Sequence, residues 1–280
     1  MRPPRPSRRL RHAGWTLGTL LLLGAIVLVD ARWGRLLEAP AALWDYGGLM
    51  ADGVLRNPFD GEFPEYWAVS FELMVESLQM AWIGTVIGAL LSFPLGFAAA
   101  SNIAPPAVVL GVRQVLNLIR AVPELIFAIA LMLPVFGLGP LAGALAIGVG
   151  SVGTLGKLTS EAIESIDPGP VEAARSTGAR PVAVLRWGVV PQVLPEVVAF
   201  WLYRFEINIR ASAVLGVLGA GGIGSLLAQL FERRLWDRIG ITIVVIVVVT
   251  VLVDQLSAAI RHRIISGDSR AARQPAESVL

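Results

Sequence analysis

Apolar residues gather in six stretches along the chain, separated by polar segments. The stretches run over about Trp15–Val29, Phe71–Ala100, Val108–Phe136, Leu141–Leu158, Pro195–Leu218 and Ile239–Val253. Most of them approach the ~20 residues that an α-helix needs to cross the hydrocarbon core of a bilayer. No stretch alternates strictly between apolar and polar residues, as a half-buried strand would. The pattern predicts an all-α integral membrane protein with about six transmembrane helices.

The first stretch has two interpretations. A basic flank followed by a short apolar run is typical of a cleaved signal peptide. However, no clear small-x-small cleavage site follows it, so we favour an uncleaved first membrane helix. On this interpretation residues 1–13 are a basic cytoplasmic tail, and residues 14–67 hold the first membrane helix and an outer segment. The transmembrane domain then covers residues 70–260, and residues 261–280 form a second cytoplasmic tail.

Arginines in the polar segments predict the orientation, because loops rich in Lys and Arg stay in the cytoplasm. The basic N-terminal arm therefore lies inside, and six crossings return the C-terminus to the same side. The segment 159–192, with three arginines between residues 175 and 186, falls inside too, and the acidic segment 30–67 falls outside. One loop disagrees: residues 231–238 carry three arginines and would lie outside, although Glu232 and Asp237 offset them in part.

Composition narrows the chemistry. The chain is 55% hydrophobic and 16% charged, whereas soluble domains are about 25% charged. A net charge of +2 is too small to indicate a nucleic-acid partner. The chain has no cysteine, and its two histidines, His12 and His262, lie in basic flanks. We therefore expect no disulfide, no thiol chemistry, no histidine triad and no metal site.

The polar segment between the fourth and fifth stretches carries signals for a helical hairpin. Asp167 is a good N-cap, and Pro168 suits the first helical position. Glu172 lies near the positive end of the helix dipole, and Gly178 is a good stop. A second short helix is expected over residues 181–191. Such a hairpin is either an ordinary connector or a docking element for a soluble partner.

The same segment resembles the EAA motif of ABC-importer permeases. That motif is matched by Glu172-Ala173-Ala174, Gly178 and Pro191. Gly188 and Val190 stand where the motif has Ile and Leu. The resemblance implies that the loop at about 159–192, beginning its helix at Asp167 and Pro168, couples the chain to an ATP-binding subunit.

More of the chain, over residues 70–260, resembles phosphonate-type permeases. The residues that carry this resemblance are Asn117, Arg120 to Glu124, the run Tyr203-x-x-Glu206-x-Asn208-x-Arg210, and Leu215 to Gly224. It implies a type I importer fold and a non-catalytic subunit that moves phosphonate, or a related phosphorus oxyanion, across the bacterial inner membrane. The implied partners are a second permease copy, two ATP-binding subunits that hold ATP and Mg, and a periplasmic substrate-binding protein. This chain itself would bind no cofactor.

Charged residues inside the apolar stretches have two interpretations. Each costs roughly 2.5–3.5 kcal/mol at bilayer depth. Arg120 and Glu124 are spaced i, i+4, as are Glu206 and Arg210. The two residues of each pair would share a helix face, and their opposite charges would partly neutralise each other. The pairs could lock helices together, or they could line a path for an anionic cargo. The candidate path residues are Asn117, Arg120, Glu124, Tyr203, Glu206, Asn208 and Arg210.

Two glycine-containing patterns resemble nucleotide sites without the context such sites need. Gly219, Gly221 and Gly224 have the spacing of a dinucleotide fingerprint, but a membrane helix precedes them where a strand is required. We expect Gly219, Gly221, Gly222 and Gly224 to serve as a hinge or to permit close packing. Lys157 follows a glycine, but Leu158 stands where a phosphate loop has Ser or Thr. Two alternatives stay open: a permease of the same architecture for another small solute, such as an amino acid or phosphite, and a secondary transporter that needs no ATPase.

Overall fold

The computed structural model describes residues 8–29, 31–56 and 61–271, and every regular element in these ranges is a helix. The chain divides into two units, residues 1–48 and 49–280. The first unit contains α1 (Arg8–Leu28), and α2 (Arg35–Ala51) begins in it. The basic tail predicted for residues 1–13 is therefore helical from Arg8, and its first seven residues lie outside the described ranges.

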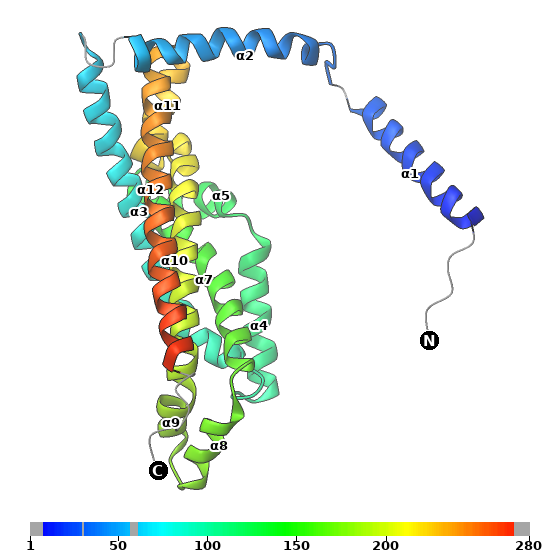
Figure 1. The fold of residues 1–280 in the computed structure, drawn as a ribbon, viewed down its shortest axis with the longest axis vertical. Helices are drawn as coiled ribbons and strands as arrows, with labels where there is room; N and C mark the ends of the chain where they lie inside the picture. The colour runs from blue at the N-terminus through cyan, green and yellow to red at the C-terminus, as the bar shows by residue number, and fades with distance from the viewer. Residues whose placement is uncertain (1–7, 30, 57–60, 272–280) are drawn as a thin grey trace. The chain divides into compact units, whose positions relative to one another are not determined.

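The second unit is a bundle of long helices with short helices between them (Figure 1). Its elements are η1 (Asp52–Arg56), α3 (Phe63–Ala99), α4 (Pro106–Ala121), α5 (Glu124–Phe127), η2 (Ala128–Met132), α6 (Leu133–Phe136), α7 (Pro140–Glu164), α8 (Pro168–Ser176), α9 (Pro181–Val184), η3 (Leu185–Val189), α10 (Val190–Leu215), η4 (Gly216–Ala220), α11 (Gly222–Glu232) and α12 (Trp236–Ala271). The elements marked η are single π-helical turns that continue a neighbouring α-helix. In Figure 1, α8 and α9 lie at one end of this bundle and α11 at the other.

Among the residues that the structure describes, four helices are long and apolar enough to cross a membrane. They are Phe63–Ala99, Pro140–Glu164, Pro181–Ala220 and Trp236–Ile264. A fifth span arises if Pro106–Ala121 and Glu124–Phe136 are counted together, and His12–Leu28 is a shorter apolar helix. All six predicted stretches are thus helical, but the third is broken by a bend of 87°.

The break lies at Val122 and Pro123. Val122 has an extended backbone, with φ −94° and ψ 119°. A residue before proline avoids the helical region for steric reasons, and proline itself has no N–H to continue the helix. Arg120 lies in the last turn of α4, and Glu124 begins α5. The prediction that these two residues share one helix face is therefore wrong.

Two other predicted boundaries differ from the structure. The second short helix of the hairpin does not end near Pro191, since α9 continues through η3 into α10 as one span, Pro181–Ala220. In the π-helical turn a carbonyl oxygen accepts a hydrogen bond from the N–H five residues later instead of four. Pro191 falls in the first turn of the α-helix that follows, where a missing N–H is tolerated. The last helix also continues past residue 261 as far as Ala271.

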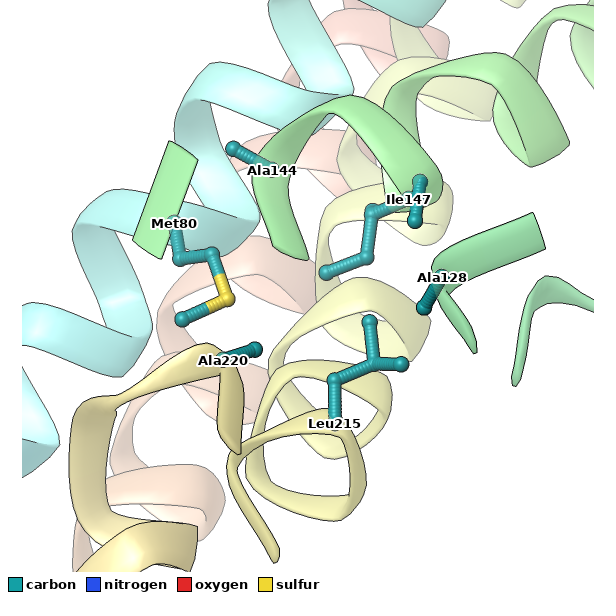
Figure 2. Close-up of a cluster of buried hydrophobic side chains, with 7 residues drawn as sticks. Met80, Ala128, Ala144, Ile147, Leu215 and Ala220 are labelled. Carbon is teal, nitrogen blue, oxygen red and sulfur yellow. The ribbon is translucent and has the colours of Figure 1, made fainter. Parts of the chain in front are cut away.

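The packing of α3 against α7 forms the centre of the bundle. A Cβ atom on Gly88 would lie 2.4 Å from the Cβ of Ser151, and one on Gly84 would lie 2.9 Å from the carbonyl oxygen of Ala144. Small residues allow such close helix contact in membranes, where apolar surface alone gives little drive for association. Next to this contact, Met80 of α3 packs among small and branched apolar side chains from several helices, including Ile147 (Figure 2).

The glycines after α10 form a tight turn and a close contact. Gly219, Gly221 and Gly222 have φ of 96°, 84° and 66°, values that residues other than glycine rarely adopt. A Cβ on Gly224 would lie 1.9 Å from the carbonyl oxygen of Ala213. The geometry thus requires glycine both for the turn and for packing, and the hinge role stays a prediction.

Candidate functional site

The hairpin at the α8 end of the bundle is built by local signals. The side chain of Asp167 accepts a hydrogen bond of 2.9 Å from the Gly169 N–H, which caps α8, and Pro168 occupies the first turn. The helix ends at Ser176, and Gly178 follows with φ 72°. These features agree with the helix ends predicted from the sequence.

One face of α8 is half-buried and the other is exposed. Val171 packs with Ile166 against an apolar cluster that includes Ile163 and Val193. Glu172 and Ala173 are exposed, and Ala174 is half-buried. The outer face of the helix, which carries Glu172 and Arg175, is therefore exposed.

A departure from the motif has a structural reason. A Cβ on Gly188 would lie 3.2 Å from the Cα of Val171 and 3.3 Å from the carbonyl oxygen of Pro170. An isoleucine, which the motif has at this position, would push α8 away from η3. Glycine therefore lets the backbones of the two elements come into contact.

A network of polar side chains crosses the interior of the bundle. Arg204 of α10 donates to the Ser151 hydroxyl at 2.9 Å and forms an ion pair with Glu124 of α5. The amide nitrogen of Asn208 donates to Thr85 at 2.8 Å and to Ser151 at 3.1 Å. Asn208 is fully buried, and Arg204 is 7% exposed. Because buried polar groups are costly without partners, these bonds tie α3, α5, α7 and α10 together specifically.

A different face of α10 carries Glu206 and Arg210. Glu206 forms an ion pair of 2.9 Å with Arg261, and Arg210 forms one with Asp254. Arg261 also lies 6.0 Å from the ring centre of Tyr203. The prediction that Glu206 and Arg210 neutralise each other along one helix is wrong, since each pairs with α12 instead.

The bend between α4 and α5 borders a cavity of about 390 Å³. Arg120, Glu124 and Thr154 contribute its polar groups, and apolar residues of α4, α5 and α10 complete its wall. Arg120 is exposed, and it has no ion-pair partner among residues 8–29, 31–56 and 61–271. Glu124 already pairs with Arg204. The cavity therefore has one uncompensated positive charge, on the guanidinium of Arg120.

Glycines of α7 let the stems of these charged side chains approach the helix. A Cβ on Gly150 would lie 2.6 Å from Cγ of Glu124, and one on Gly153 would lie 2.7 Å from Cγ of Arg120. Asn117, one turn before Arg120, borders a separate polar cavity of about 290 Å³. The structure thus divides the seven candidate path residues among two cavities and the α10–α12 contact, with Asn208 behind the first cavity in the buried network.

Several partners in these networks were missed by sequence reasoning. They are Thr85, Ser151, Arg204, Asp254 and Arg261. A charge in an apolar stretch was the available signal for Arg204, which stands in the run that resembles phosphonate-type permeases. The two hydroxyl residues gave no signal, because Ser and Thr are common in membrane helices.

Comparison with known proteins places the chain in a family. Residues 70–266 match the family described as the inner membrane component of binding-protein-dependent transport systems. The chain belongs to this family. As an inner membrane component of a transport system, it is a permease-type subunit, and its apolar helices lie in the bilayer.

Two relatives of this inner membrane component carry more specific names. The phosphite transport system permease protein PtxC of Stutzerimonas stutzeri is 39% identical over 254 residues, which cover 89% of this chain and 90% of the relative. The phosphate-import permease protein PhnE of Mycolicibacterium smegmatis is 41% identical over 206 residues, covering 72% of this chain. That match spans only 38% of the length of PhnE.

Solved structures confirm the fold of the family. A chain of the MetNI methionine ABC transporter in an inward-facing conformation matches with a TM-score of 0.63 and 21% sequence identity. The match covers 73% of this chain and 99% of that chain. The predicted all-α fold of an ABC-importer permease is therefore confirmed.

Proposed function

We propose that this chain is the membrane-spanning permease subunit of an ABC importer that moves a phosphorus oxyanion, such as phosphonate or phosphite, across the bacterial inner membrane. The observation that carries the proposal is the 39% identity to a phosphite permease along 89% of the chain. The second relative, named for phosphate import, has a cargo of the same chemistry. The N-terminus and α8 lie on the cytoplasmic side in this proposal, in line with the distribution of arginine.

The proposed coupling element is α8. Two permease copies form a pair, and each presents the exposed face of its α8, with Glu172 and Ala173. Two ATP-binding subunits, which hold ATP and Mg, dock on these two faces. A periplasmic binding protein delivers the cargo at the opposite end. Closure of the ATP-binding subunits then displaces α8 and switches the access of the path between the two sides. The permease itself forms no covalent bond with cargo and binds no cofactor.

The proposed path passes Arg120. Its exposed guanidinium at a cavity of about 390 Å³ suits an anion, because the planar fork of N–H donors matches phosphoryl oxygens. Glu124 pairs with Arg204, and Asn208 shares the Ser151 hydroxyl with Arg204, so both shape the wall. Asn117 continues the exposed face of α4. Since Glu206 and Arg210 are engaged by α12, we propose that they hold two helices together and do not meet the cargo; Tyr203 lies on that same side of α10.

Uptake by reconstituted complexes tests this function. The permease is purified with its ATP-binding partner, placed in proteoliposomes with the binding protein outside, and supplied with labelled methylphosphonate, phosphite, phosphate or methionine. We expect ATP-dependent uptake of a phosphorus oxyanion and none of methionine. Uptake of methionine would establish the amino-acid alternative, and uptake without ATP would establish a secondary transporter.

Two arginine variants test the path. Arg120→Gln is expected to lower uptake about tenfold, as the loss of about 1.4 kcal/mol of charge-assisted binding implies, while basal ATP hydrolysis persists. Arg210→Gln is the matched control, since it removes an equal charge at the α10–α12 contact. Equal uptake by the Arg120→Gln variant and the wild type would remove Arg120 from the path.

A further inference from the structure

The side chain of Gln192 bridges α8 and α10. Its amide oxygen accepts a hydrogen bond of 3.1 Å from the backbone N–H of Asp167, and its amide nitrogen donates to the carbonyl oxygen of the same residue at 3.2 Å. The nitrogen also donates to the carbonyl oxygen of Gly188 at 2.5 Å. Asp167 is the N-cap of α8, so one amide group holds both backbone groups of the residue that begins the helix.

This contact differs in kind from the rest of the attachment of α8. The half-buried face of α8 rests on α10 and η3 through apolar residues such as Val171, and such contacts resist sliding only weakly because they are non-directional. The paired hydrogen bonds of Gln192 require a fixed distance and orientation. They act beside the close backbone contact at Gly188, so the start of α8 is held at one defined point.

The helix that carries Gln192 continues to the polar network in the bundle. Pro181–Ala220 forms one span, and Arg204 lies twelve residues after Gln192, about 18 Å along a helix that rises 1.5 Å per residue. Arg204 contacts Glu124 at the cavity that also contains Arg120. A displacement of α8 that reaches Gln192 therefore has a continuous helical connection to this cavity.

We propose that Gln192 is a positioning residue that transmits the displacement of α8 to α10 and so to the cavity at Arg120. This inference rests on the proposed function, because it assigns a role within the coupling of ATP hydrolysis to transport. Gln192 itself contacts neither nucleotide nor cargo.

Gln192→Met is the decisive variant, since methionine keeps the length of the side chain and removes its hydrogen bonds. Gln192→Glu keeps an acceptor for the Asp167 N–H but places a carboxylate against two carbonyl oxygens. Gln79→Ala is the control, because Gln79 is exposed on α3 and the structure shows no side-chain hydrogen bond for it among residues 61–271. Each variant is first compared with the wild type by thermal unfolding.

Two measurements then separate this inference from the proposed function. Hydrogen exchange of the permease reports the attachment directly, and loss of the paired bonds should speed exchange of the Asp167 and Gly169 N–H groups about fivefold or more in Gln192→Met. Labelled phosphite uptake per ATP hydrolysed, measured with the full complex, should fall by a similar factor while ATP hydrolysis continues. The control should change neither quantity.

The outcomes are distinct. Unchanged exchange at residues 167–169, or unchanged uptake per ATP in Gln192→Met, would overturn the role of Gln192. If the wild-type complex itself shows no ATP-driven uptake, the proposed function fails, and the transmission role falls with it, while exchange still reports whether the amide holds α8. Faster exchange together with a lower ratio of uptake to hydrolysis, at wild-type thermal stability, would establish the role.

Discussion

The ion pair between Glu124 and Arg204 offers the sharpest test of how this bundle is held together. The side chain of Arg204 is 9% exposed and that of Glu124 is 24% exposed. Glu124→Gln replaces the carboxylate with a neutral amide of the same shape. The guanidinium of Arg204 then keeps its bond to Ser151 but loses the charge that compensates it inside the bundle.

The expected cost follows from the burial of the pair. Removing one partner of a buried ion pair costs about 3–5 kcal/mol, because the other charge stays desolvated. Glu124 is one-quarter exposed and its replacement can still accept a hydrogen bond, so we expect about 2–3 kcal/mol. For a unit of this size, 1 kcal/mol shifts the midpoint of thermal unfolding by about 2–4 °C, so Tm should fall by about 4–12 °C.

The chain supplies a matched control for the assay. Lys157 and Glu161 form an ion pair of 3.5 Å whose side chains are about half exposed. Such i, i+4 surface pairs contribute about 0.3–0.5 kcal/mol, so Glu161→Gln should lower Tm by no more than about 2 °C. Both variants are measured in the same detergent, by the fluorescence of the tryptophans during heating.

A double-mutant cycle distinguishes pairing from simple loss of a side chain. Arg204→Met alone leaves Glu124 as the uncompensated charge, whereas the double variant removes both charges. The double variant should therefore be more stable than the sum of the single effects predicts, by about 1–3 kcal/mol. A Glu124→Gln midpoint no lower than that of Glu161→Gln, or single effects that simply add, would refute the reasoning.

Two further predictions concern single backbone features. Asp167→Ala should remove the cap of α8, cost about 0.5–2 kcal/mol and reduce copurification of the ATP-binding subunit, whereas Asp167→Asn should retain it. Equal copurification of the two variants would contradict this. Gly224→Ala should prevent accumulation of folded protein, since its Cβ would lie 1.9 Å from the carbonyl oxygen of Ala213, whereas Gly111→Ala meets nothing within 4 Å. Size-exclusion chromatography in detergent measures this, and equal monodisperse yields of the two alanine variants would be the contrary result.

The sequence was sufficient for elements whose signals are local. Apolar length predicted α3, α7 and α12, and the residues Asp167, Pro168 and Gly178 predicted the ends of α8, because caps and left-handed stops depend on a few neighbouring residues. The break at Pro123 was missed although proline signals it. The apolar run continues on both sides, and a run of hydrophobic residues does not report the direction of the helix axis.

The candidate site depended on contacts that local patterns do not report. The i, i+4 rule paired Arg120 with Glu124, but the partner of Glu124 is Arg204, 80 residues away along the chain. Which face of α10 meets which helix depends on how several helices pack at once. Sequence therefore identified charged positions in the bilayer, and the structure was needed to assign their partners.

The glycine contacts between α3 and α7 also constrain how the protein can move. At Gly84, Gly88 and Gly96, any Cβ would meet atoms of α7 at less than 3 Å. A shift of one helix past the other by a single residue would place larger side chains at these points. The two helices therefore resist sliding past each other, so we expect them to move as one unit, with any displacement of α8 or α10 taken up outside this contact.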